Sequence, residues 1–157
     1  MGVEIERKFL LKNTDWKQYA EKSIRMKQQY LPFQEKSGTG RIRIAGDQAF
    51  LTLKTRVKGI SRGEFEYEIP VEDAERIMEL ICTGFSVEKT RYIVPFAGKI
   101  WEIDEFAGEN AGLILAEIEL DSEDEKFELP PWIGEEVTGD FHYYNSYLAE
   151  HPLNQRV

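Results

Sequence analysis

Charged residues recur in this chain as pairs separated by a single residue. The acidic pairs are Glu4 and Glu6, Glu66 and Glu68, Glu102 and Asp104, and Glu117 and Glu119, and Lys8 follows the first of them. The basic pairs are Arg41 and Arg43, Lys54 and Arg56, and Lys89 and Arg91. Residues at i and i+2 of a strand share one face, so each pair would project from one side of a sheet. Carboxylates bind hard cations and basic pairs bind polyanions, so this spacing indicates a metal and phosphate site.

An alternative interpretation is that these faces are the solvated side of an ordinary antiparallel sandwich. Like charges at adjacent positions on one face repel each other, and an ordinary solvated strand mixes Thr, Lys, Glu and Ser. Segregation by sign is explained if acidic and basic faces meet across an enclosed space. The eight paired acids then stand against six bases, namely Lys8, Arg41, Arg43, Lys54, Lys89 and Arg91.

The elements that must position these pairs are strands, because period-2 segments bounded by Gly, Pro, Asn or Asp run through the chain. We expect eight strands, beginning near Gly2, Ser23, Gly40, Gln48, Gly63, Phe85, Gly98 and Leu113. The face opposite the charges is largely apolar, as Ile42, Leu53 and Trp101 illustrate. Hairpin turns are predicted at residues 45–48 and 96–99. Short connections favour closure into an eight-stranded antiparallel β-barrel.

Three short helices are predicted, at Thr14 to Glu21, Val71 to Cys82 and Asp140 to Glu150, with Asp140 as an N-cap. They would cover the outside or one end of the barrel. The acidic segment from Asp121 to Glu136, broken by Pro130 and Pro131, is predicted to be a solvated connection. No repeat or linker is evident, so residues 1–157 are expected to form a single, mainly β domain with short helices (α+β).

Composition excludes several classes of function. A formal net charge of -9 disfavours nucleic-acid binding, and no segment reaches the roughly 18 apolar residues of a membrane helix. Two histidines and one cysteine are too few for an ordinary zinc site. No export signal is recognisable, so we expect a cytoplasmic protein with a small-molecule partner and leave a homodimer open.

The motifs closely resemble those of the CYTH family, the triphosphate tunnel metalloenzymes. The Glu-x-Glu-x-Lys motif of that family stands here at residues 4–8. Companion segments follow in the family's order at residues 26–31, 41–43, 51–54, 64–68, 89–91, 101–104, 112–119 and 137–145. The resemblance therefore covers nearly the whole chain, and it implies an eight-stranded antiparallel tunnel.

The resemblance also implies roles for individual residues. Divalent metal, one or two ions of Mg²⁺ or Mn²⁺, would be held by Glu4, Glu6, Glu117 and Glu119, with Glu66, Glu68 and Asp104 as further ligands. Phosphate oxygens would be bound by Lys8, Arg41, Arg43, Lys54, Lys89 and Arg91. Catalysis would involve Glu4, Glu6, Lys8 and Tyr30. Tyr30 would position a phosphate or leaving group, or would only form part of the wall, and His142 stays unassigned.

The expected reaction is metal-dependent hydrolysis of the terminal phosphate of tripolyphosphate, with nucleoside or thiamine triphosphates as further candidates. A class IV adenylate cyclase and a triphosphate-binding module without turnover are the alternatives. Cyclisation requires a pocket that reads adenine and aligns the ribose, and no residues for such a pocket are evident. Hydrolysis requires only an oriented water, which a bound metal supplies.

Overall fold

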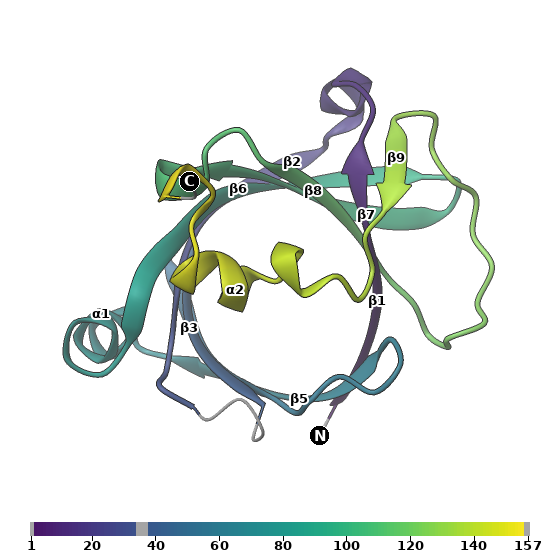
Figure 1. Cartoon of the computed structure of the whole chain (residues 1–157). Helices are drawn as coiled ribbons and strands as arrows, with labels where there is room; N and C mark the ends of the chain where they lie inside the picture. Colours follow the sequence, from purple (N-terminus) through teal and green to yellow (C-terminus); the bar gives the residue numbers. More distant parts are fainter. Residues whose placement is uncertain (1, 34–37, 156–157) are drawn as a thin grey trace.

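The computed structural model describes residues 2–33 and 38–155, and its strands form one antiparallel sheet that closes on itself (Figure 1). The ring has the order β5-β4-β3-β2-β6-β7-β8-β1, and pairing of β5 with β1 closes it. A further strand, β9, lies beside β1. The bounds are β1 Gly2–Leu11, β2 Lys22–Tyr30, β3 Thr39–Ala45, β4 Gln48–Lys54, β5 Ser61–Ile69, β6 Thr83–Phe96, β7 Lys99–Ala107, β8 Ile114–Glu119 and β9 Ile133–Glu136. The predicted eight-stranded barrel is confirmed, with each predicted start within two residues of the observed one.

The first strand closes the barrel because it pairs with different neighbours along its length. Residues 2–5 pair with residues 61–64 of β5, and residues 6–9 pair with residues 116–119 of β8. The last part of β1 pairs with β9. The Glu-x-Glu-x-Lys segment therefore lies where the two ends of the sheet meet.

Both predicted hairpin turns are present. Gly46 and Asp47 join β3 to β4, and Ala97 and Gly98 join β6 to β7. Ala97 and Gly98 both adopt positive φ, at 49° and 78°, which matches the right-handed twist of the flanking strands. These tight turns fix the register of the strands that carry the basic pairs.

The hydrophobic core lies largely outside the ring, because the inward face of the strands is charged. The largest cluster includes Trp101, Ile103 and Ile118 on the outer faces of β7 and β8. It is covered by Trp16, from the 3₁₀ helix Asp15–Tyr19, and by Trp132 next to β9. Figure 1 shows both of these covering segments outside the ring. The barrel wall is thus sealed from the outside.

Two smaller clusters complete the core. Helix α1 (Val71–Leu80) packs Ala74 and Met78 against Ile42 and Ala49 on the outer faces of β3 and β4. The other cluster joins Leu148 of α2 (Asn145–Glu150) to the end of the barrel; its remaining buried members are Val87, Phe106, Leu115, Val137 and Ala149. In the view of Figure 1 the segment that contains α2 crosses the opening of the ring. No helix in the described ranges is long and apolar enough to span a membrane.

Two sequence predictions were wrong in part. The segment from Asp121 to Glu136 ends in β9, and it buries Trp132 and Ile133 against the barrel. A strand of four residues is too short to show a period, so the pattern gave no signal for it. The helix predicted from Asp140 to Glu150 is divided into a 3₁₀ turn, Phe141–Tyr143, and α2, because Tyr144 between them is extended. Asp140 caps the 3₁₀ turn by accepting the His142 N–H.

The position of the outer core predicts which isoleucine side chains contribute to the free energy of unfolding. Ile42 is fully buried beneath α1, although its neighbours Arg41 and Arg43 face the interior of the barrel. Ile42→Ala should lower the free energy of unfolding by about 2–5 kcal/mol, because it leaves a cavity under the helix. Urea denaturation measures this, with Ile100→Ala as the matched control because Ile100 is 54% exposed. Equal losses in the two variants would contradict an outer core at Ile42.

Candidate functional site

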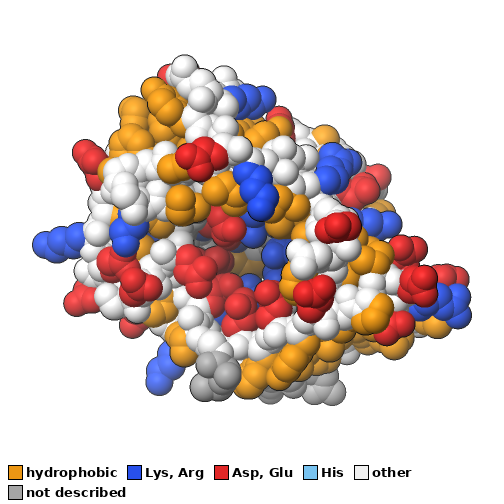
Figure 2. All heavy atoms as spheres, turned by 180° about the vertical axis from the view of Figure 1, so that it is seen from behind, with side chains coloured by type: hydrophobic (Ala, Val, Ile, Leu, Met, Phe, Trp, Pro, Cys, Tyr) orange, Lys and Arg blue, Asp and Glu red, His pale blue; other side chains and the backbone are white. Residues whose placement is uncertain are grey.

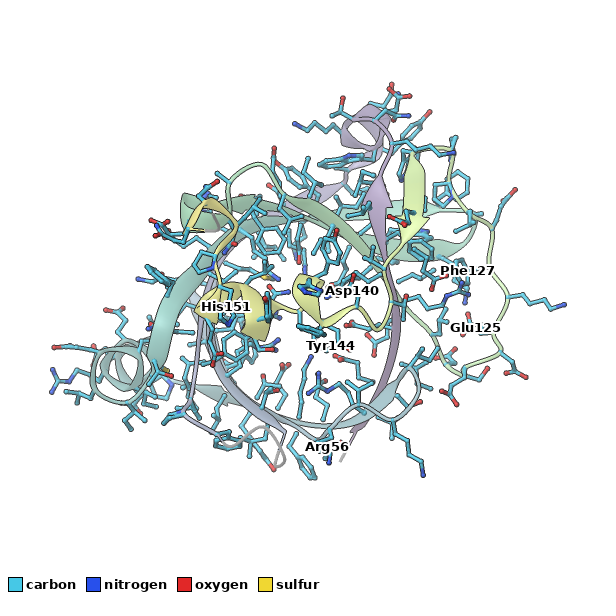
Figure 3. All side chains as sticks on the ribbon, in the orientation of Figure 1. Arg56, Glu125, Phe127, Asp140, Tyr144 and His151 are labelled. Carbon is cyan, nitrogen blue, oxygen red and sulfur yellow. The ribbon has the colours of Figure 1, made fainter. Side chains whose placement is uncertain are left out.

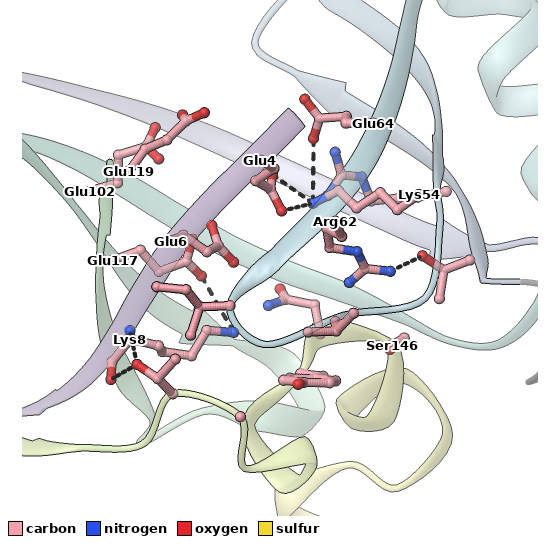
Figure 4. Close-up of a pocket in the computed structure, with 18 of the residues that line it drawn as sticks. Glu4, Glu6, Lys8, Lys54, Arg62, Glu64, Glu102, Glu117, Glu119 and Ser146 are labelled. Carbon is pink, nitrogen blue, oxygen red and sulfur yellow. Dashed lines mark hydrogen bonds and ion pairs between the residues drawn. The ribbon is translucent and has the colours of Figure 1, made fainter. Parts of the chain in front are cut away.

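The barrel encloses a cavity of about 250 Å³ whose lining is dominated by charge. Among the described residues, seven basic and seven acidic side chains line it, together with ten uncharged residues. The view in Figure 2, from the side opposite that of Figure 1, shows a hollow with acidic side chains around it and basic ones deeper inside. Figure 4 shows the labelled lining residues converging from several strands. The segregated pairs of the sequence therefore meet in one enclosed space.

Most of the residues singled out in the sequence line this cavity. They are Glu4, Glu6, Lys8, Tyr30, Arg41, Arg43, Lys54, Glu66, Lys89, Arg91, Glu117 and Glu119. Asp104 lies behind the wall, 1% exposed, where it contacts Lys89 and Arg91. Glu68 is not among the lining residues, and its carboxylate accepts a hydrogen bond from Gln48 at 3.4 Å.

Sequence reasoning missed two charged lining residues, Arg62 and Glu64, and it placed Glu102 among the paired acids without giving it a role. The period of two could have found Arg62 and Glu64, because they precede Glu66 on the same face of β5. Thr138, Tyr144 and other residues near the C-terminus also line the cavity, through a segment without strand periodicity.

Carboxylates gather on one wall because their strands are adjacent and in register. Glu6 on β1 is directly opposite Glu119 on β8, and Glu117 on β8 is directly opposite Glu102 on β7. Burial, together with the neighbouring Glu117 and Glu4, raises the pKa of Glu6 to about 8. Within the described chain, no lysine or arginine nitrogen lies within ion-pair distance of the Glu6 carboxylate. With a pKa of about 8, Glu6 keeps its proton at neutral pH, so this wall contains a buried carboxyl group that has no cationic partner among the described residues.

A buried ion-pair cluster on β6 and β7 adjoins this wall. The Arg91 guanidinium donates two hydrogen bonds to Asp104, Nε to Oδ1 at 2.8 Å and Nη2 to Oδ2 at 2.9 Å. The Lys89 ammonium lies 2.7 Å from Asp104 Oδ2. Burial alone would raise the pKa of Asp104, but Arg91 and Lys89 hold it well below its ordinary value. Burial lowers the pKa of Lys89 to about 7. The neighbouring cations Arg91 and Arg43 contribute to this lowering, whereas Asp104 acts in the opposite direction. One carboxylate thus compensates two cations only in part.

The two arginines of β3 carry positive charge that carboxylates compensate only in part. Arg43 donates from Nε to Gln28 Oε1 at 2.9 Å, and no carboxylate of the described residues lies within ion-pair distance of it. Burial, with Arg41 and Arg91 nearby, lowers the pKa of Arg43 to about 9. Arg41 is 3.6 Å from Glu66, and its buried Nε has no hydrogen-bond partner among the described residues. Both guanidiniums therefore have donors available for an anion.

Two lysines, Lys8 and Lys54, form ion pairs with carboxylates along the cavity wall (Figure 4). Lys54 Nζ lies 3.0 Å from both carboxylate oxygens of Glu4 and 3.5 Å from Glu64. Lys8 Nζ lies 3.5 Å from Glu117. Burial alone would raise the pKa of Glu117, but Lys8 and Arg91 lower it to about 2. These pairs hold the walls in place with groups that can exchange partners when an ion enters.

One end of the cavity is lined by the segment that follows β9. Thr138 accepts the Lys8 backbone N–H at 2.9 Å, and the Lys8 ammonium donates to the Tyr143 carbonyl at 3.1 Å. Tyr144 lies 5.6 Å from the Lys8 ammonium, and Figure 3 shows it within the ring of strands. This segment therefore positions Lys8 and limits access of water from that end.

The acidic wall fits a divalent cation by its donor set. Hard cations prefer carboxylate oxygens. Glu6 and Glu119 lie directly opposite each other on β1 and β8. The Cβ atoms of directly opposed residues on antiparallel strands are about 5 Å apart. Within residues 2–33 and 38–155, no three Asp, Glu, His or Cys side chains are already gathered as a metal site. Repulsion between the acidic side chains keeps them apart, and a bound cation would offset that repulsion.

Comparisons with known proteins agree with this geometry. The CYTH domain model matches residues 2–146. The chain is 47% identical to an inorganic triphosphatase from Acetivibrio thermocellus, over 97% of this chain and 96% of that protein. It is 41% identical to an inorganic triphosphatase from Nitrosomonas europaea, over 94% of this chain and 97% of that protein. The solved structure of the inorganic triphosphatase NE1496 superposes with a TM-score of 0.68 at 37% identity, covering 100% of this chain and 97% of that one. A charged antiparallel tunnel, the Glu-x-Glu-x-Lys strand and these matches together show that the chain belongs to the CYTH family.

Proposed function

We propose that this protein is a divalent-metal-dependent inorganic triphosphatase that hydrolyses the terminal phosphate of tripolyphosphate inside the barrel. The names of the relatives from Acetivibrio thermocellus and Nitrosomonas europaea support this assignment. Its small-molecule substrate would enter the cavity together with Mg²⁺ or Mn²⁺.

The observation that carries the proposal is a buried carboxyl group and a buried guanidinium in one cavity, each without an ionic partner in the described part of the chain. Glu6 has no basic partner within ion-pair distance, and Arg43 has no acidic partner, among the described residues that surround them. A cation alone would leave Arg43 without a counter-ion, and an anion alone would give Glu6 no cation to replace its proton. A complex of divalent metal and triphosphate supplies both charges at once.

The basic residues would bind and orient the phosphate chain. Arg43 and Arg41 can donate to phosphate oxygens through planar forks, whereas Lys8 and Lys54 act as compact point charges. Phosphoryl transfer depends mainly on such positioning and on neutralising charge at the transferring group. The closed end lined by Thr138 and Tyr144 would limit screening of these interactions by bulk water.

The carboxylates would hold the metal, with Glu4, Glu6, Glu117 and Glu119 as ligands and Glu66 as a further candidate. Asp104 would instead hold Arg91 and Lys89 from behind the wall, and Glu68 lies outside the lining. When bound, the ion would lower the pKa of a water molecule and withdraw charge from phosphate oxygens. Lys54 contacts two carboxylates, Glu4 and Glu64. Once Glu4 binds the metal, the Lys54 ammonium would turn from Glu4 toward phosphate. Tyr30 would place its hydroxyl near the phosphate or the leaving group.

The position of the uncharged lining residues favours hydrolysis over cyclisation. Most of them come from the connection after β4, as Val57 and Ile60 do, or from the C-terminal segment, as Tyr144 and Ser146 do. The central strands contribute chiefly charges, which suit phosphates and leave little surface to read a nucleobase. We therefore propose tripolyphosphate as a better substrate than ATP.

The acidic wall generates the first test of this function. Glu6→Gln should remove metal-dependent phosphate release and leave the fold intact, because an amide keeps the shape but weakens a ligand for a hard cation. Phosphate release from tripolyphosphate is measured against Mg²⁺ and Mn²⁺ concentration, with circular dichroism as the check on folding. Glu135→Gln is the matched control, since Glu135 is exposed on β9. Turnover of Glu6→Gln equal to that of the wild type at saturating metal would exclude Glu6 as a ligand.

Product analysis provides the second test. With Mg²⁺ or Mn²⁺ the purified protein should convert tripolyphosphate to pyrophosphate and orthophosphate, use ATP less well and make no cyclic AMP. Addition of EDTA should stop the reaction, because the carboxylate wall would lose its cation. Anion chromatography separates all of these products. Cyclic AMP with pyrophosphate from ATP, and no orthophosphate from tripolyphosphate, would replace the hydrolase assignment with a cyclase.

A further inference from the structure

A fully buried glutamine stands behind the cavity wall, in contact with two groups that line it. Gln28 on β2 has no exposed surface and is not itself a lining residue. Its Oε1 accepts from Arg43 Nε at 2.9 Å. Its Nε2 donates to the Tyr30 hydroxyl oxygen at 3.0 Å and to Asn145 Oδ1 at 3.2 Å. A buried amide that uses both of its ends in this way has one orientation.

The chemistry of Arg43 fixes that orientation. A guanidinium can only donate, so the Gln28 atom that faces Arg43 Nε must be the oxygen. The amide nitrogen then faces Tyr30 and Asn145 and donates one hydrogen bond to each of them. Because the Tyr30 oxygen accepts in this bond, the hydroxyl hydrogen of Tyr30 is left to donate elsewhere.

The same bonds set what Arg43 and Tyr30 offer to a ligand. With Nε held by Gln28, Arg43 keeps its two terminal nitrogens for the cavity that it lines. Tyr30 also lines the cavity and offers a hydroxyl hydrogen there. Two donors with fixed direction suit the oxygens of a phosphate.

Asn145 connects this array to the C-terminal segment. Its Oδ1 accepts from Gln28 Nε2 and also from the Lys89 ammonium at 2.9 Å. Asn145 is the first residue of α2, so the segment at the end of the barrel contacts Gln28 and Lys89 through one oxygen atom. The continuous path Arg43, Gln28, Asn145, Lys89 therefore joins β3, β2, α2 and β6.

We propose that Gln28, braced by Asn145, is a positioning residue that orients the Arg43 guanidinium and the Tyr30 hydroxyl toward the bound triphosphate. This inference rests on the proposed function for its ligand. Gln28 acts through its neighbours and does not touch the substrate. Its replacement should therefore weaken binding through Arg43 and Tyr30, and should do little once those groups are gone.

The test compares two identical substitutions on one strand. Gln28→Leu removes all three hydrogen bonds, whereas Gln29→Leu alters the next residue, whose side chain donates to the Gly84 carbonyl at 3.1 Å in an exposed setting. Calorimetric titration of tripolyphosphate in EDTA gives the Kd without turnover, and phosphate release with Mg²⁺ gives kcat/KM. We expect Gln28→Leu to raise Kd and lower kcat/KM by about tenfold or more, as for loss of a hydrogen bond to a charged group, and Gln29→Leu to match the wild type.

A double-mutant cycle separates positioning from a structural role. In an Arg43→Ala, Tyr30→Phe background, Gln28→Leu should change Kd by less than about threefold, because its route to the ligand is gone. An equal effect in both backgrounds, or equal Kd values for Gln28→Leu and Gln29→Leu, would overturn the proposal. Gln28→Met replaces Gln28→Leu if the latter does not fold, and failure of both to fold would assign Gln28 a structural role and overturn it too. Absence of phosphate release by the wild type, with the difference in Kd intact, would remove the hydrolase assignment and still support the positioning role.

Discussion

The structure depends on one constraint, the enclosure of seven acidic and seven basic side chains among the described lining residues of a small cavity. Burying charge is costly unless it is paired, and the protein meets that cost unevenly. Asp104 is held by two cations and Glu117 by Lys8, whereas Glu6 and Arg43 have no ionic partner in the part of the chain that the structure describes. The uneven pairing leaves a site that a metal and a polyanion complete together.

Charge inside the ring also determines where the hydrophobic core must lie. Because side chains alternate along a strand, each charged inward position places an apolar neighbour on the outer face. Trp101 and Ile103 alternate with Glu102 and Asp104 on β7, and they are covered from the outside. The 3₁₀ helix Asp15–Tyr19, α1 and the region of β9 therefore serve the site indirectly, by sealing the wall that carries it.

The period of two allowed the barrel and most of its lining to be predicted from the sequence. It predicted Arg41 and Arg43 on one face and Ile42 on the other, and the structure agrees. It could not predict which partners the side chains choose, because the contact between Gln28 and Asn145 spans 117 positions and follows no period. The four-residue β9 and the division of the C-terminal helix at Tyr144 depend on packing against the finished barrel. Local patterns thus identified the walls of the site, and tertiary contacts set its internal geometry.

Metal and triphosphate would be complementary occupants of one enclosed site, and thermal unfolding with each ligand tests this complementarity most directly. A non-hydrolysable triphosphate analogue with Mg²⁺ should raise the melting temperature with concentration, because both ligands bind the folded state. The rise in melting temperature with both ligands should exceed the sum of the rises with each ligand alone, because one ligand alone leaves either Glu6 or Arg43 without an ionic partner. An unchanged melting temperature at saturating concentrations of both would contradict the account.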